Sequence, residues 1–223
     1  LIGFLGFSLP FSIISWGAQF IPSSLVAILM GANPIITMVL SYFLLKDRFL
    51  NIKVIFGIFL GLFGIILLVG VNSLNSSTIN DNFFVGQIAV LLGTFSFALA
   101  SVMVKNAPPE DSFERSLSSL ICGSIISLLI LSLFENNPLN FNNISIKSLF
   151  ALFLLGVFPT GIATLIWFKI ISLKGPLFLS LVNYLIPVWA LLIGIFFLNE
   201  KINFVIGFGL IFITMGIWLI EKR

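Results

Sequence analysis

Long stretches of the chain contain no charged residue, and these stretches determine the predicted architecture. The first, Leu1 to Leu45, is long enough for two membrane crossings and is divided near Pro22. A helix crosses about 30 Å of hydrocarbon with roughly 20 residues, and nearly every later charge-free stretch fits one crossing. The pattern therefore predicts eight helices, at residues 1–20, 22–45, 52–71, 84–105, 114–134, 148–171, 176–198 and 203–220.

The apolar stretches are continuous, which favours helices over the alternating strands of a membrane β-barrel. The fold class predicted is an all-α, multi-pass membrane protein. A soluble, fully buried helical protein is the alternative. Only 9% of the residues are charged and 59% are hydrophobic, with a mean hydropathy of +1.21. A soluble domain carries about 25% charged residues, so this composition cannot coat a water-facing surface.

The same composition excludes several classes of function. A net charge of +3, spread along the chain, does not indicate a nucleic-acid partner. Cys122 is the only cysteine and histidine is absent, so the sequence predicts no intrachain disulfide, no zinc or haem site and no cofactor. An enzyme would need a catalytic set that these residues do not supply. The expected partners are the lipid bilayer and a small-molecule substrate.

Basic residues fall mostly on one side of the predicted membrane topology. Short loops rich in Lys and Arg stay in the cytoplasm. Of the 11 basic residues, only Lys147 and Lys201 fall on the opposite side when the loops are numbered alternately from the C-terminus. We therefore expect both chain ends to be cytoplasmic, in the plasma membrane or, in a prokaryote, the bacterial inner membrane.

The chain also contains two similar segments, residues 22–64 and 176–216. In each, one proline opens a helix, a second interrupts it near the middle, an acidic-basic pair ends it, and a glycine-rich helix follows. The paired positions are Pro22 and Pro176, Pro34 and Pro187, the tetrapeptides 45–48 and 198–201, and Gly57 and Gly64 with Gly209 and Gly216. The charge pattern places Asp47 inside and Glu200 outside, so the two segments run in opposite directions. Inverted repeats with broken helices are typical of secondary transporters, which bind substrate near the midplane.

Together these motifs resemble the EamA-type members of the drug/metabolite transporter superfamily, over essentially the whole chain. The resemblance implies ten helices in two inverted five-helix repeats. Residues 1–71 would then form the last three helices of the first repeat, and residues 84–221 the complete second repeat. Two N-terminal helices are expected to be missing. The resemblance implies transport of a small metabolite, such as an amino acid or a related compound.

Polar side chains recur on single faces of the predicted helices, which predicts a shared polar cavity. Pro34 and Pro187 cannot bond to the carbonyls of Met30 and Asn183, and each leaves an acceptor within the membrane. The residues predicted to contact substrate are Asn33, Pro34, Thr37, Thr94, Thr164, Trp167, Asn183, Tyr184 and Pro187. The alternatives are that the hydroxyls bond to nearby carbonyls, that Trp167 marks an interface, and that the prolines only shape packing.

The predicted function is secondary transport of a small polar or amphipathic metabolite by alternating access. A non-transporting assembly or structural subunit is the alternative. No Asp, Glu or His lies in the middle third of a predicted helix. Coupling to protons would then depend on the missing helices, or transport would be facilitated diffusion or exchange.

Glycines at positions 57, 61 and 64 follow one face of their predicted helix. Small residues at this spacing let helices approach closely in a membrane. The spacing is compatible with packing inside the chain or with a homodimer face.

Overall fold

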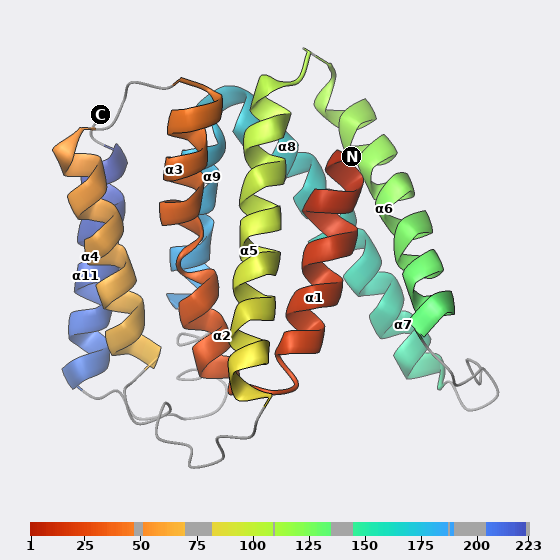
Figure 1. The fold of residues 1–223 in the computed structure, drawn as a ribbon, viewed down its shortest axis with the longest axis horizontal. Coiled ribbons are helices and arrows are strands. Elements are labelled where there is room, and N and C mark those ends of the chain that lie inside the picture. The colour runs from red at the N-terminus through yellow and green to blue at the C-terminus, as the bar shows by residue number, and fades with distance from the viewer. Residues whose placement is uncertain are drawn as a thin grey trace.

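All elements in the described part of the chain are helices, as the charge-free stretches predict (Figure 1). The computed structural model describes residues 1–46, 51–69, 82–108, 110–134, 145–186, 188–189 and 204–221. The helices are η1 (Phe4–Ser8), α1 (Leu9–Gly17), α2 (Ser23–Met30), α3 (Asn33–Leu44), α4 (Ile52–Val69), α5 (Phe83–Asn106), α6 (Ser112–Phe134), α7 (Ile146–Leu155), η4 (Gly156–Ile162), α8 (Ala163–Lys174), α9 (Pro176–Ser180) and α11 (Phe204–Glu221). The predicted all-α fold class is confirmed.

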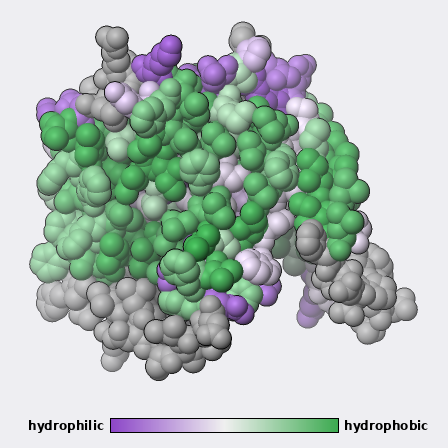
Figure 2. Space-filling model, in the orientation of Figure 1, coloured by the Kyte–Doolittle hydropathy of each residue, from purple (hydrophilic) through white to green (hydrophobic). Residues whose placement is uncertain are grey.

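These helices have the length and surface of membrane spans. Among the described residues, four segments are long and apolar enough to cross a bilayer: Leu25–Leu44, Phe83–Asn106, Ser112–Leu133 and Ile146–Lys174. Shorter apolar helices cover Phe4–Gly17, Ile52–Leu67, Pro176–Ile186 and Phe208–Ile220. Large apolar side chains point outward from nearly all of them, and the visible face is hydrophobic between polar ends (Figure 2). Such a surface is stable in lipid and not in water.

Helix α5 lies at the centre of the bundle and positions the other elements (Figure 1). It packs against η1 and α1, against α2 and α3, and against α8 and α9. Helices α4 and α11 form a pair at one edge, whereas α6 and α7 lie at the other edge (Figure 1). Residues from both halves of the sequence therefore meet around α5.

The α4–α11 pair is held together by facing glycines. A Cβ atom added to Gly57 would lie 2.8 Å from the carbonyl oxygen of Gly216, and one added to Gly64 would lie 2.7 Å from that of Gly209. In the other direction, a Cβ on Gly216 would lie 2.6 Å from the oxygen of Gly57. The two backbones touch where any side chain would separate them. The glycine face is thus used for packing within the chain.

The first helix contains a π-helical turn next to a proline. Pro10 has no N–H, and the N–H of Leu9 donates to the carbonyl of Phe4, five residues earlier. The carbonyl of Leu5 would accept from residue 9 in an α-helix or from residue 10 in a π-helical turn. The N–H of Leu9 is used by Phe4 and Pro10 has none, so this carbonyl has neither donor. Ser96 of α5 donates its hydroxyl to this oxygen at 2.7 Å. A neighbouring helix thus satisfies a polar group that the proline frees within the membrane.

The segment α7–η4–α8 has the same feature. Pro159 lies inside η4 and cannot donate to the carbonyl of Leu155, four residues earlier. The hydroxyl of Thr160 donates to that carbonyl at 3.0 Å. The wider π-helical turn makes room for the proline ring, so the helix continues instead of ending.

Two helices are interrupted near the interior. The first break is at Gly31 and Ala32, and Pro34 lies in the first turn of α3. The break therefore precedes the proline by two to three residues, because proline fits the first turn of a helix, where its missing N–H needs no partner. This corrects the expectation that the helix is interrupted at Pro34 itself. The second break is at Leu181, whose N–H bonds only three residues back, to Phe178.

The turn between α8 and α9 requires glycine. Gly175 has a φ of 88°, a left-handed conformation that residues with a side chain rarely adopt. Pro176 follows as the first residue of α9, where its fixed φ suits the start of a helix. This turn sends the chain back across the bundle beside α8, and so brings α9 next to α3 and α5.

Candidate functional site

Buried polar side chains are distributed over α5 and five other helices of the bundle. They come from η1, α3, α5, α6, α8 and α9: Ser8, Asn33, Thr37, Ser41, Thr94, Ser96, Ser101, Ser116, Ser119, Thr164 and Ser180. Polar groups are costly within a bilayer and usually face the interior of a bundle or a water-filled cavity. Their distribution here makes the surroundings of α5 the polar part of the molecule.

Three polar residues lie one turn apart on α3. Asn33 is 3% exposed, and its Oδ1 accepts a hydrogen bond from the hydroxyl of Thr37 at 3.3 Å. Ser41 follows one turn later, and within the described part of the chain its buried Oγ has no hydrogen-bond partner. The first turn of α3, just after the break, therefore presents a buried amide next to a buried hydroxyl.

Helices α5 and α8 supply the two predicted threonines. Thr94 donates its hydroxyl to the carbonyl of Val90 at 2.8 Å, one turn back in its own helix. This bond is the one expected if the residue has no contact with substrate. Thr164 is buried on α8, at 5% exposure. The contribution of either hydroxyl to substrate binding stays a prediction.

Trp167 lies in a cluster of aromatic rings contributed by three elements. Its ring centroid is 5.9 Å from that of Phe7 on η1, 5.7 Å from that of Phe97 on α5, and 4.8 Å from that of Phe168 on α8. The indole Nε1 is buried, and no acceptor for it lies among the described residues. A buried donor without a partner is rare in folded proteins, and a bound molecule is one explanation.

Asn183 and Tyr184 follow the second break and are both bonded to carbonyls. Asn183 Nδ2 donates to the carbonyl of Ser180 at 3.2 Å. The Tyr184 hydroxyl donates to the carbonyl of Ile58 on α4 at 2.8 Å, and its ring lies directly against Gly61. Tyr184 is fully buried and in this conformation joins the helical residues after the second break to α4. Pro187 lies outside the described residues.

The structure brings together some of the predicted site residues and separates others. Asn33, Pro34 and Thr37 share the start of α3, and α3 packs against α9 and α5. Thr164 and Trp167 lie on α8, which also packs against α5 and α9. Helix α5, which carries Thr94, thus lies between an α3 group and an α8 group. Sequence reasoning missed the cluster partners Phe7 and Phe97, because 26 phenylalanines make no single one distinctive.

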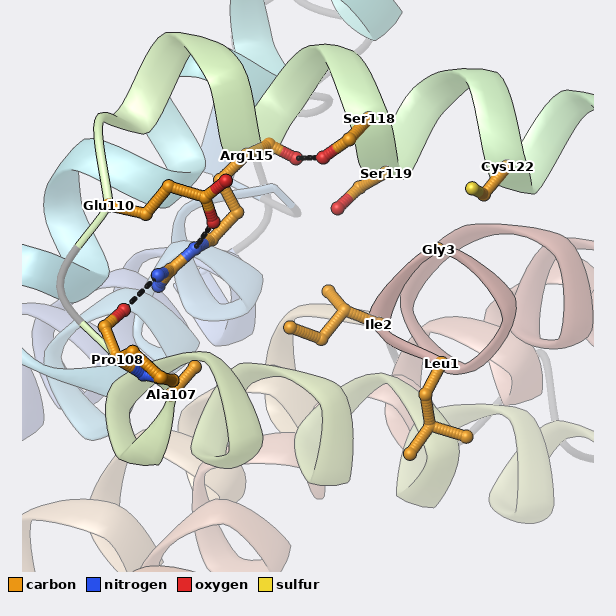
Figure 3. A pocket seen from close by; sticks show the side chains of 10 residues that line it. All are labelled: Leu1, Ile2, Gly3, Ala107, Pro108, Glu110, Arg115, Ser118, Ser119 and Cys122. Carbon is orange, nitrogen blue, oxygen red and sulfur yellow. Dashed lines mark hydrogen bonds and ion pairs between the residues drawn. The ribbon is translucent and has the colours of Figure 1, made fainter.

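A cavity of about 390 Å³ lies at the end of the bundle where α5 and α6 meet (Figure 3). It is bordered by the first residues of the chain, by the α5–α6 loop and by the first turns of α6. Arg115 and Glu110 lie at one side of it, and Cys122 lies farther along α6 (Figure 3). Sequence reasoning did not single out Arg115, which resembles an ordinary loop charge at the start of a helix.

Apolar helices with lipid-compatible surfaces, packed around a polar interior, define a multi-pass membrane protein. Residues 1–70 and 84–221 match the EamA-like transporter family. The chain belongs to this family and is a membrane transporter of small molecules rather than an enzyme.

Several curated relatives with similar sequences are named as transporters. The uncharacterized transporter YoaV of Bacillus subtilis (strain 168) is 26% identical over 219 residues, which are 98% of this chain and 71% of YoaV. Protein PecM of Dickeya dadantii (strain 3937) is 25% identical, over 99% of this chain and 72% of PecM. The WAT1-related protein At4g08290 of Arabidopsis thaliana is 28% identical over 66% of this chain and 38% of its own length.

A solved crystal structure has the same fold. It superposes with a TM-score of 0.82 at 19% identity and covers 99% of this chain and 76% of the other. At this identity the likeness concerns the arrangement of helices and not the substrate.

Proposed function

We propose that the protein is a secondary transporter of the plasma membrane, which moves a small polar or amphipathic metabolite by alternating access. The observation that carries the proposal is the pair of interrupted helices. Asn33 begins α3 directly after one break, and Asn183 lies two residues past Leu181 at the other. The two helices pack against each other and against α5. Interrupted helices expose backbone groups to a ligand within the membrane, where continuous helices cannot.

Three pairs of helices support an inverted-repeat organisation, with α5 to α11 as the second repeat and η1 to α4 as the end of the first. The third helices, η1–α1 and α7–η4–α8, each combine a π-helical turn with a proline, Pro10 or Pro159. The fourth helices are the two interrupted ones. The fifth, α4 and α11, are glycine-rich and pack on each other. In alternating access, two such halves would rock around a shared site.

The proposed substrate site lies between the α3 group and the α8 group. Asn33 and Asn183 supply amides that can donate and accept hydrogen bonds, and Trp167 supplies a donor within an aromatic wall. A small metabolite with both polar and apolar parts matches these groups. Tyr184 would contact it only if the bond to Ile58 opens.

The described basic residues support the proposed orientation of the chain. The basic residues at or beside helix ends on one side of the bundle are Lys46, Lys53, Lys105, Arg115 and Lys174, and Lys169 lies in the half of α8 nearer that side. Lys147 lies at the start of α7 on the other side. Polar surface is visible along the corresponding edge in Figure 2. The positive-inside rule makes the first side cytoplasmic.

Solute flux in proteoliposomes tests the proposal. Thermal-shift screening of the purified full-length protein against a metabolite library would supply solutes, and uptake of each hit would be measured. We expect Asn33→Ala and Asn183→Ala each to raise the half-saturation concentration about 5- to 30-fold, the effect of losing about 1–2 kcal/mol. Asn106→Ala, at an exposed position at the end of α5, is the matched control. Uptake kinetics identical to those of the unmodified chain in both site variants would contradict the proposed site.

A further inference from the structure

The side chain of Arg115 fills the loop between α5 and α6. Its Nε donates to Oε2 of Glu110 at 3.1 Å, its Nη1 donates to the carbonyl of Val104 at 3.2 Å, and its Nη2 donates to the carbonyl of Pro108. The Arg115 side chain is 12% exposed, whereas that of Glu110 is 46% exposed. One guanidinium thus holds the end of α5, the loop and the start of α6 together (Figure 3).

This arrangement suits arginine in particular. The carbonyls in the last turn of a helix lack the donor four residues on, and that of Val104 accepts only a long bond of 3.3 Å from the N–H of Ala107 within the backbone. The fork of a guanidinium can donate to several such acceptors at once. The Arg115 bonds to Val104 and Pro108 bring the first turn of α6 onto the end of α5. A lysine could not span both carbonyls and the carboxylate, because its donors diverge from a single nitrogen.

Two cavities meet at this side chain. The first, of about 390 Å³, extends toward Gly3 and Cys122. The second, of about 270 Å³, extends between α5, α6 and α8 and reaches Phe168. Both are bordered by Ala107, Pro108, Glu110 and Arg115. These four residues therefore form a wall that the two cavities share.

The second cavity points toward the aromatic cluster of the candidate substrate site. Phe168 borders this cavity, and its ring packs against Trp167 with a centroid distance of 4.8 Å. A second bond closes the same end of the bundle, since Lys105 Nζ donates to the carbonyl of Ser172 at 3.1 Å and ties α5 to α8. Arg115 and Lys105 are thus the cations that hold the ends of three helices around this cavity.

We propose that Arg115 is a gating residue at the basic end of the transporter. In the closed conformation its guanidinium separates the two cavities. Release of its bonds lets α6 move away from α5, joins the cavities, and opens a path from the basic end to the Trp167 cluster. The partly exposed Glu110 makes release feasible, because water can replace the ion pair. The inference rests on the proposed function, in which this path is one side of the alternating-access cycle.

Accessibility of a buried cysteine tests the gate without any solute. Thr164 lies one turn deeper than Phe168 on α8 and is 5% exposed. A Thr164→Cys reporter in a Cys122→Ser background would be treated, in liposomes, with a membrane-impermeant, charged methanethiosulfonate reagent from the basic side. We expect Arg115→Gln to speed the modification about tenfold or more. The variant loses the charge-assisted hydrogen bonds that stabilise the closed conformation, so the open conformation becomes more populated. Lys147→Gln, which removes a cation at the opposite end, should leave the rate unchanged.

A reporter rate that is the same with and without Arg115→Gln would overturn the proposal. Should that variant fail to insert, Arg115→Lys takes its place with the same two outcomes, because it keeps the charge and loses the fork. Labelling and flux separate the two hypotheses. A chain that gates the reporter but moves no solute refutes the proposed function alone, whereas a chain that moves solute with unchanged labelling refutes the gate alone.

Discussion

The indole nitrogen of Trp167 illustrates how one residue can indicate a function. The donor is buried, and within the described residues it has no acceptor. An unmade hydrogen bond of this kind costs free energy that a folded protein usually avoids. The rings of Phe7, Phe97 and Phe168 surround the indole, so packing explains its aromatic part but not its N–H. A ligand that accepts a hydrogen bond would explain both.

Replacing Trp167 with phenylalanine separates binding from stability. Trp167→Phe keeps an aromatic ring and removes a donor that stabilises nothing in the described structure. We expect thermal stability within about 1 kcal/mol of the unmodified chain and a solute affinity about 5- to 30-fold weaker. Trp189→Phe, at a site 62% exposed, is the control and should change neither. Unchanged affinity in Trp167→Phe would remove the indole from the site.

Tyr184 differs from Trp167, because its hydroxyl already has a hydrogen-bond partner in the structure. We expect Tyr184→Phe to lower the free energy of unfolding by about 0.5–1.5 kcal/mol, since it loses the bond to the Ile58 carbonyl and keeps the ring against Gly61. The measurement is thermal unfolding in detergent. Tyr42, the only other tyrosine, is 47% exposed and makes Tyr42→Phe the matched control. Equal stability of the two variants would show that the bond to α4 contributes nothing.

At the scale of elements, the α4–α11 pair depends on the absence of side chains. The facing atoms are backbone groups, which cannot rotate away as a flexible side chain can. A methyl group at the contact must therefore push the two helices apart, and the neighbours that pack on them would have to follow. Close backbone packing of this kind is what holds helices together in lipid, where apolar burial gives little driving force.

Alanine at Gly216 tests this contact directly. Its Cβ would lie 2.6 Å from the carbonyl oxygen of Gly57 and 2.8 Å from the nitrogen of Gly61. We expect Gly216→Ala to destabilise the protein by about 1–3 kcal/mol, measured by thermal unfolding. Gly156→Ala is the matched control, because nothing lies within 4 Å of its added Cβ. If both variants unfolded at the same temperature, the glycine contact would not be a source of stability.

At the scale of the whole molecule, the sequence predicted where the helices lie along the chain better than which residues of different helices are in contact. Helix positions follow directly from charge-free stretches, because lipid imposes both their length and their composition. The contacts depend on which faces meet after folding. Ser96 bonds to the carbonyl of Leu5, 91 residues away in the sequence, and Tyr184 bonds to that of Ile58, 126 residues away. No local sequence pattern predicts either pair.

The candidate site was predictable to a similar extent. Helical spacing identified Asn33 and Thr37, which lie together, because residues four apart share a face. It did not identify the aromatic wall around Trp167, which three separate elements build. The sequence also predicted the first interruption at Pro34 itself. That prediction used the rule that proline breaks helices and did not consider that proline is favoured in the first turn of a helix. Arg115 gave no sequence signal, because its importance depends on carbonyls that only the folded loop brings near.

The proposed transport requires that two halves of the chain cross the membrane in opposite directions around a polar site. Single cysteines at Lys46 and Lys201, in a Cys122→Ser background, lie in the paired tetrapeptides 45–48 and 198–201 of the two repeats. Their labelling by a membrane-impermeant thiol reagent would be compared in right-side-out and inside-out vesicles. We expect position 46 to react only from the cytoplasmic side and position 201 only from the outer side. Reaction of both positions from the same side would contradict it.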